Sequence, residues 1–194
     1  MAYTWFDRVV AWRRFRAALP HIRPGVRVCD LGCGEGAPFL RFAGRRIGWG
    51  IGVDDFPGKP NLGGWPLVRA DIASGLPFRD EAFDCVVMLA VLEHLREPQP
   101  LLREASRILV PGGSLVLTWP GAAVDPLLAV VARLGFVNHD MHFEQHQARI
   151  PTRRLRSMLR EAGFGSIRHG RFEVGLNHWL VATRPGRGQA RAAH

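Results

Sequence analysis

Apolar and polar positions alternate along this chain in a way that predicts strands separated by helices. Five mainly apolar runs have the length of a strand: 26–31, 48–54, 67–70, 83–88 and 114–120. Such runs are typical of strands buried on both faces of a parallel sheet. In 98–109 and 151–162 the apolar residues recur every three or four positions, which predicts amphipathic helices. The chain is therefore expected to fold as an α/β domain with a largely parallel sheet.

The two ends of the chain follow other patterns. Aromatic and basic side chains alternate in residues 4–18, with apolar positions three and four apart, so we expect an N-terminal cap helix within residues 1–20. The same basic helix suits peripheral contact with an anionic membrane. Two strand-like runs, 166–174 and 176–183, meet at Gly175 and suit an antiparallel pair.

The last residues set the expected domain boundary. Residues 184–194 are rich in Gly, Arg and Ala and have no periodicity, which predicts a disordered basic tail. We therefore expect a single domain over residues 1–183. Within it, 124–134 has a helical pattern, and 136–150 is an irregular polar insertion.

Composition narrows the class of protein. The net charge is +9, and all 26 basic residues are arginines except Lys59. The arginines are scattered and form no long block, so they are interpreted as solvated surface residues rather than as a nucleic-acid site. The three cysteines are an odd number without a C-x-x-C pair, which favours a reducing cytoplasm. The oligomeric state is left open.

A glycine-rich loop follows the first apolar run. The segment from Val28 to Gly36 reads VCDLGCGEG, and a helical pattern begins after Pro38. Strand, tight glycine turn and helix N-terminus together form the local architecture of a nucleotide-type cofactor site. The candidate cofactor-binding residues here are Asp30, Gly32, Cys33, Gly34, Glu35 and Gly36.

The acids beside this loop indicate which cofactor it binds. Gly32, Gly34 and Ala37 also fit G-x-G-x-x-A, a form of the dinucleotide fingerprint. Asp30 and Glu35, however, would repel a pyrophosphate and attract a ligand that carries an ammonium and a sulfonium. S-adenosyl-L-methionine has both groups.

Two later strands also end in acids. Asp54, about 20 residues after the glycines, is placed to accept hydrogen bonds from ribose hydroxyls, and Asp55 takes this role if the register differs by one. Asp71 is placed to receive an adenine amino group, with Ile72 against the ring; the alternative for Asp71 is a turn cap. Ligands of open α/β sheets bind beyond these carboxyl ends.

The second half of the predicted sheet carries a family resemblance. The motifs LPF, FDCVV, LEHL and REASRILVPGGSLVLTWP, between Leu76 and Pro120, resemble class I S-adenosylmethionine-dependent methyltransferases of the type 11, small-molecule branch. The resemblance is close over 26–120 and loose over 150–183. It implies a Rossmann-like seven-stranded sheet in the order 3-2-1-4-5-7-6, with strand seven antiparallel and helices on both faces. It also implies that Met88 and Leu89 line the cofactor site.

Histidines are the candidate catalytic residues. His94 follows the fourth strand, in the LEH motif, where a structural hydrogen bond is an equally good interpretation. His142 and His146 lie in the insertion, and His146 loosely matches a histidine that the family often has there. Their spacing would suit a metal on a helix, but metal sites normally draw ligands from more than one element, so no metal is expected.

The acceptor is expected to be a small, partly hydrophobic molecule bound by 121–150, methylated on oxygen rather than on nitrogen or carbon. No N/D-P-P-Y/F motif follows the fourth strand, where 88–91 reads MLAV, so methylation of exocyclic amines is disfavoured. Two alternatives remain: a nicotinamide-dinucleotide oxidoreductase, and a non-catalytic protein that binds S-adenosylmethionine.

Overall fold

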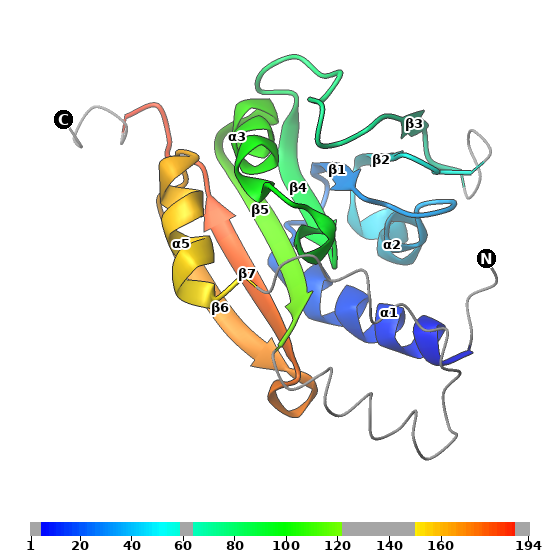
Figure 1. The fold of residues 1–194 in the computed structure, drawn as a ribbon. Coiled ribbons are helices and arrows are strands. Elements are labelled where there is room, and N and C mark those ends of the chain that lie inside the picture. Colours follow the sequence, from blue (N-terminus) through cyan, green and yellow to red (C-terminus); the bar gives the residue numbers. More distant parts are fainter. Residues whose placement is uncertain (1–4, 59–63, 122–149, 189–194) are drawn as a thin grey trace.

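A computed structural model describes residues 5–58, 64–121 and 150–188 of the chain, with side chains from Arg8 onward. Within these residues seven strands form one sheet in the order β3-β2-β1-β4-β5-β7-β6 (Figure 1). β7 is antiparallel to both of its neighbours, β5 and β6. The pairs β2–β3, β1–β2, β1–β4 and β4–β5 are parallel. The strand order expected from the family resemblance is confirmed.

The elements lie close to their predicted positions. The strands are β1 Arg27–Leu31, β2 Trp49–Asp54, β3 Leu67–Arg69, β4 Phe83–Leu89, β5 Leu109–Pro120, β6 Ile167–Phe172 and β7 Asn177–Thr183. The α-helices are α1 Trp5–Ala18, α2 Pro38–Ala43, α3 Pro98–Ile108 and α5 Thr152–Glu161. Short 3-10 turns are η1 Leu19–His21, η2 Gly44–Arg46, η3 Leu92–His94 and η5 Glu173–Gly175.

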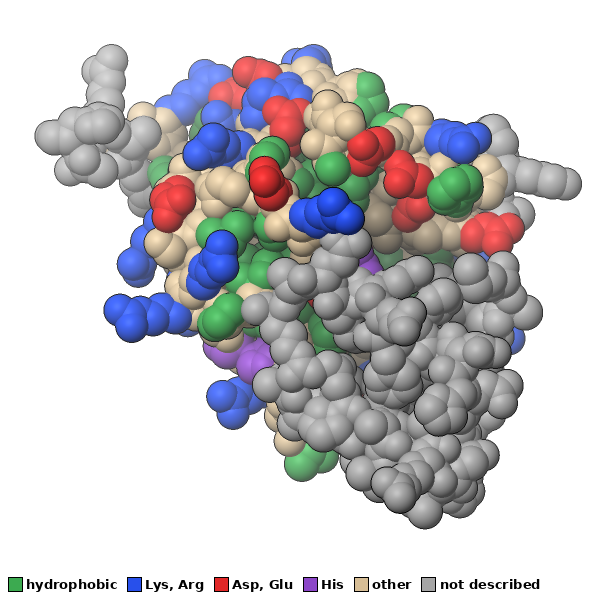
Figure 2. All heavy atoms as spheres, viewed as in Figure 1, with side chains coloured by type: hydrophobic (Ala, Val, Ile, Leu, Met, Phe, Trp, Pro, Cys, Tyr) green, Lys and Arg blue, Asp and Glu red, His purple; other side chains and the backbone are tan. Residues whose placement is uncertain are grey.

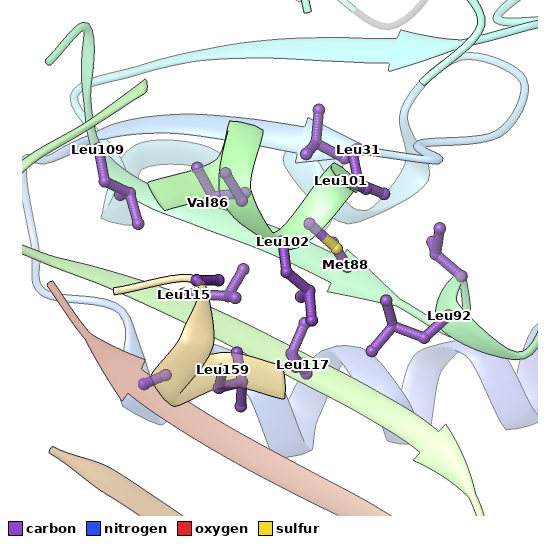
Figure 3. Close-up of a cluster of buried hydrophobic side chains, with 14 of the residues drawn as sticks. Leu31, Val86, Met88, Leu92, Leu101, Leu102, Leu109, Leu115, Leu117 and Leu159 are labelled. Carbon is purple, nitrogen blue, oxygen red and sulfur yellow. The ribbon is translucent and has the colours of Figure 1, made fainter. Parts of the chain in front are cut away.

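Helices cover both faces of the sheet. α3 and α5 pack on one face, where apolar side chains from β1, β4, β5 and both helices, most of them leucines, meet in one cluster (Figure 3). α1 and α2 pack on the other face over a second cluster that includes Val28, Val87 and Val116. Because successive residues of a strand point to opposite faces, each central strand supplies side chains to both clusters. This burial explains why the strands have few polar positions.

The N-terminal helix is less amphipathic than its spacing predicted. Phe15 packs edge-on against Phe39 and Ala18 is buried, but Val9 and Trp12 are 44% and 45% exposed. The apolar stripe of α1 is therefore divided between the sheet and solvent. In the described parts of the chain, no helix is long and apolar enough to span a membrane.

Strand β5 starts earlier than expected. The apolar run was predicted to begin at Ser114, but β5 begins at Leu109, which pairs with Phe83 before the register shifts at a bulge. Gly112 adopts a positive φ of 79° at this bulge. Backbone groups at a bulge need other hydrogen-bond partners, and the backbone of Arg184 supplies them. Gly112 N donates to the Arg184 carbonyl, and Arg184 N donates to the Gly113 carbonyl, both at 2.9 Å.

The chain after β7 therefore differs from the expected tail. The Arg184 guanidinium donates to the Leu109 carbonyl, and Arg187 pairs with Glu81 at 2.8 Å. Arg184 is thus part of the folded domain rather than the start of a free tail. Residues 189–194 lie outside the described residues, as do the predicted helix 124–134 and almost all of the insertion.

Candidate cofactor site

The loop after β1 is a tight turn that depends on glycine. Gly32, Gly34 and Gly36 have φ values of 70°, 65° and 72°, a region that costs other residues energy. A Cβ at Gly32 would also lie 2.5 Å from Val91 Cγ2. The Gly32 N–H donates to the Val53 carbonyl at 2.8 Å, which joins the loop to the end of β2. The predicted strand, turn and helix therefore meet at the carboxyl edge of the sheet.

Asp54 holds this loop in place, a role that its sequence position did not indicate. Its Oδ2 accepts a hydrogen bond from Gly34 N, and its Oδ1 accepts one from Phe56 N, both at 2.9 Å. Each carboxylate oxygen keeps a further acceptor site. The ribose contact expected for Asp54 is compatible with this geometry and stays a prediction.

Asp30 is the most unusual group of the site. Its side chain is 2% exposed at the end of β1, and Oδ2 has no hydrogen-bond partner among the described residues. Burial raises the pKa of Asp30 well above its usual range, and the nearby Asp54 carboxylate raises it further. An orphaned buried oxygen fits a ligand that donates hydrogen bonds or carries positive charge. This observation agrees with the cationic cofactor inferred from the sequence.

The third strand-end acid also caps a turn. Asp71 accepts hydrogen bonds from Ala73 N at 2.8 Å and from the Ser74 hydroxyl, and these bonds lower its pKa. The capping alternative is therefore present, while the adenine contact stays a prediction. Burial raises the pKa of Asp55, and the charges of Asp71 and Asp54 raise it further, so the fold brings these acids together. Figure 2 shows acidic side chains gathered over this part of the sheet.

The other expected cofactor residues divide into buried and accessible ones. Met88 has no exposed surface and lies inside the cluster of Figure 3, so its side chain cannot face a ligand. Leu89 is partly exposed and Ile72 packs beside the larger cluster. Glu35 is exposed on the loop. Burial raises the pKa of the Cys33 thiol far above its usual range, which argues against a nucleophilic thiolate.

The histidine candidates are only partly placed. His94 is exposed on η3, and His142 and His146 lie outside the described residues. The structure adds a pair that sequence reasoning missed: His169 Nε2 and His178 Nδ1 are 2.8 Å apart on β6 and β7. The two rings share one face because His178 is opposite Arg171, two residues from His169; a register centred on Gly175 would have placed the histidines on opposite faces. The described residues contain no group of three metal-ligating side chains.

The family of the chain follows from a comparison with known domains. A family model described as a methyltransferase domain matches residues 5–169. The chain belongs to this family. The fold is thus that of a class I methyltransferase, whose cofactor is S-adenosyl-L-methionine.

Individual relatives agree with this assignment. A ubiquinone/menaquinone biosynthesis C-methyltransferase of Vibrio cholerae is 32% identical over 130 residues, 60% of this chain and 50% of its own length. A probable tRNA methyltransferase 9B of Homo sapiens is 34% identical over 115 residues, 55% of this chain and 24% of its own. The chain thus spans half or less of these two relatives.

A solved structure shares the fold. A phosphoethanolamine N-methyltransferase 2 of Haemonchus contortus, in complex with S-adenosyl-L-methionine, superposes with a TM-score of 0.65 at 16% identity, covering 90% of this chain and 53% of that one. At this identity the likeness concerns the fold alone. Its bound ligand is the cofactor that the family uses.

Proposed function

We propose that this protein transfers a methyl group from S-adenosyl-L-methionine to an oxygen of a small-molecule acceptor. The observation that carries the proposal concerns Asp30, beside a glycine loop in a methyltransferase fold: its Oδ2 is buried and has no hydrogen-bond partner within residues 5–58, 64–121 and 150–188. A cofactor with positive charge offsets the cost of an ionised carboxylate at this position. A pyrophosphate would add negative charge instead.

The chain's own residues have separate roles in this proposal. Asp30 and the loop 32–36 hold the methionine part, Asp54 holds the ribose while it orders the loop, and Asp71 with Ile72 receives the adenine. When bound, the cofactor supplies an activated methyl group. The protein contributes position and a cleft from which water is excluded.

The acceptor is proposed to carry an acidic hydroxyl, as a phenol or a hydroquinone does. The expected acceptor segment begins at Gly121, directly after β5 and two residues after Trp119. The relative from Vibrio cholerae is named for ubiquinone and menaquinone biosynthesis, which supports a quinol-like acceptor. The same name supports a second candidate, methylation of a ring carbon, because deprotonating a phenolic hydroxyl activates both the oxygen and the neighbouring carbon.

Calorimetry on the full chain tests the cofactor first. We expect S-adenosylhomocysteine to bind with micromolar or better affinity and NAD not to compete. Tight NAD binding without S-adenosylhomocysteine binding would instead indicate the oxidoreductase.

Acceptor assays then use labelled S-adenosylmethionine with catechol, 1,4-naphthalenediol and unmodified tRNA. We expect a methylated diol whose product spectrum distinguishes oxygen from carbon. Methylation of tRNA alone would overturn the small-molecule acceptor, and the relative named as a tRNA methyltransferase makes this arm necessary. Binding without any transfer would favour the non-catalytic protein.

A further inference from the structure

Three aromatic side chains form a stack at the end of β5, outside the residues assigned to the cofactor. The Trp119 and His178 rings lie 5.1 Å apart and nearly parallel, at 10°, and the His178 and His169 rings are also 5.1 Å apart. Trp119 is buried, while both histidines are half-buried. In Figure 2 histidine side chains reach the surface over β6 and β7. The stack is thus anchored on one side and accessible on the other.

The hydrogen bond within the stack gives the two histidines different roles. His178 Nδ1 and His169 Nε2 share a hydrogen bond of 2.8 Å. If His178 Nδ1 carries the proton, its Nε2 keeps a free lone pair and can accept a second proton. A base whose orientation is set by a third group is the arrangement found in activated nucleophile sites. His169 is then the orienting group.

The Nε2 edge of His178 faces a position without a side chain. A Cβ at Gly121 would lie 3.0 Å from His178 Nε2 and 2.8 Å from the Leu176 carbonyl oxygen. Gly121 N donates to that same carbonyl at 2.6 Å, which holds the backbone in place. Any larger residue at 121 would therefore crowd the imidazole nitrogen. Gly121 is also the first residue of the expected acceptor segment.

The register of the sheet brings this edge close to the cofactor end of β4. Leu89 of β4 is opposite Thr118 of β5, and the next residue, Trp119, is opposite His178 of β7. His178 thus lies two strand spacings from the end of β4, roughly 10 Å. Since β4 ends beside the cofactor loop of β1, an acceptor between them can contact both the methyl donor and the imidazole.

The charges around the pair favour a neutral resting state. Burial lowers the pKa of His178, and Arg171 lowers it further. Burial also lowers the pKa of His169, together with His178, Arg156 on α5 and Arg171. A base must be unprotonated to act, and the lowered pKa of each histidine favours that form at neutral pH. The face of the Trp119 ring then offsets the charge that His178 gains in the reaction.

We infer that His178 is the general base that removes the proton from the hydroxyl group of the methyl acceptor. His169 is the residue that positions His178. This inference rests on the proposed function. His178 Nε2 takes the hydroxyl proton, and the oxygen electron pair forms a bond to the methyl carbon. The carbon–sulfur bond breaks and its electron pair stays on sulfur. The products are the methyl ether, S-adenosylhomocysteine and an imidazolium, which returns its proton to solvent.

Variants that keep or remove one nitrogen at a time test the inference. His178→Asn retains an amide near the Nδ1 position and removes Nε2, and we expect a loss of about 10²–10⁴-fold in kcat. His169→Gln retains an acceptor near the Nε2 position, so it should keep more activity than His169→Ala. His21→Asn is the matched control, because His21 stacks on Trp179 at 4.1 Å on the opposite face and should leave kcat unchanged.

The pH dependence separates a base from a packing residue. With a methylated diol as the readout, the rate of the wild-type chain should rise with pH through the pKa of His178, below the usual 6.5 of histidine. That limb should disappear in His178→Asn. Equal activity of His178→Asn and wild type, with S-adenosylhomocysteine binding intact in both, would overturn the inference while leaving the proposed function standing.

A spectroscopic measurement decides the matter without an acceptor. Nitrogen-15 histidine spectra of the full chain distinguish which ring nitrogen carries the proton. We expect His178 to be protonated on Nδ1 at neutral pH and to lose this preference in His169→Ala but not in His169→Gln. A proton on His178 Nε2 would overturn the inference, because that nitrogen could not then act as a base.

Discussion

Replacing Asp30 by asparagine should stabilise the unliganded protein while it abolishes cofactor binding. The carboxyl group is 2% exposed, has an oxygen without a partner in the part of the chain that the structure describes, and lies near the charge of Asp54. Its pKa is therefore far higher in the folded state than the 3.8 of a free carboxyl. Between these two values the folded state binds more protons than the unfolded state, so wild-type stability falls as the pH rises through that window.

The size of the effect follows from the burial. A buried polar group without a partner costs about 1–3 kcal/mol, and a charged group costs more. Asparagine removes the charge but not the burial, so the gain should approach about 1–3 kcal/mol at the alkaline end and vanish at acidic pH. For a domain of this size each kcal/mol shifts the melting temperature by about 2–4 °C.

Thermal melts of both proteins across the pH range measure this difference. Asp84→Asn is the control of opposite sign, because Arg27 donates three hydrogen bonds to Asp84 and lowers its pKa. The stability that this pair contributes is fully present above pH 3.8. It is lost as the pH falls through the lower pKa that Asp84 has in the folded state. Both groups are partly exposed, so the loss in Asp84→Asn should be near 1 kcal/mol.

Calorimetry completes the Asp30 experiment. Cofactor binding should release a proton from Asp30, so wild-type affinity should rise with pH, and this linkage should be absent in Asp30→Asn. An asparagine variant that melts below wild type at every pH, or that binds S-adenosylhomocysteine normally, would refute the reasoning. The first result would mean that the carboxyl group has a hydrogen-bond partner in the folded protein, and the second that ligand binding does not depend on its charge.

Two further variants probe the loop. Asp54→Ala should weaken S-adenosylhomocysteine binding by about 1.5–3 kcal/mol per lost charge-assisted bond, measured by calorimetry, and should loosen the loop because Gly34 N and Phe56 N lose their acceptor; unchanged affinity would transfer the ribose contact to Asp55. Gly32→Ala should lower stability in urea unfolding by about 1–3 kcal/mol, through its positive φ and the contact with Val91. Adding Val91→Ala should recover part of this loss, and no recovery would assign the whole cost to the backbone.

Much of the site was predictable from short-range pattern. The turn at Gly32 to Gly36 was recognisable because a tight loop needs residues that tolerate positive φ, and all three glycines adopt it. Strand-end acids were recognisable because parallel strands end at the same edge of a sheet. The strand order is different: the period of the apolar runs predicted only an α/β sheet, and the order 3-2-1-4-5-7-6 came from the family resemblance.

Tertiary structure decided how these groups interact. Asp54 was predicted to lie at the end of the second strand. Only the packing of β2 against the loop makes its carboxylate a hydrogen-bond acceptor for Gly34 N. The sequence shows Asp30 as one more acid, and burial at the centre of the sheet is what raises its pKa. His169 and His178 meet only through the register of β6 and β7. Local pattern reports what a residue can do, whereas burial and long-range register determine its partners, because both arise only when distant segments pack together.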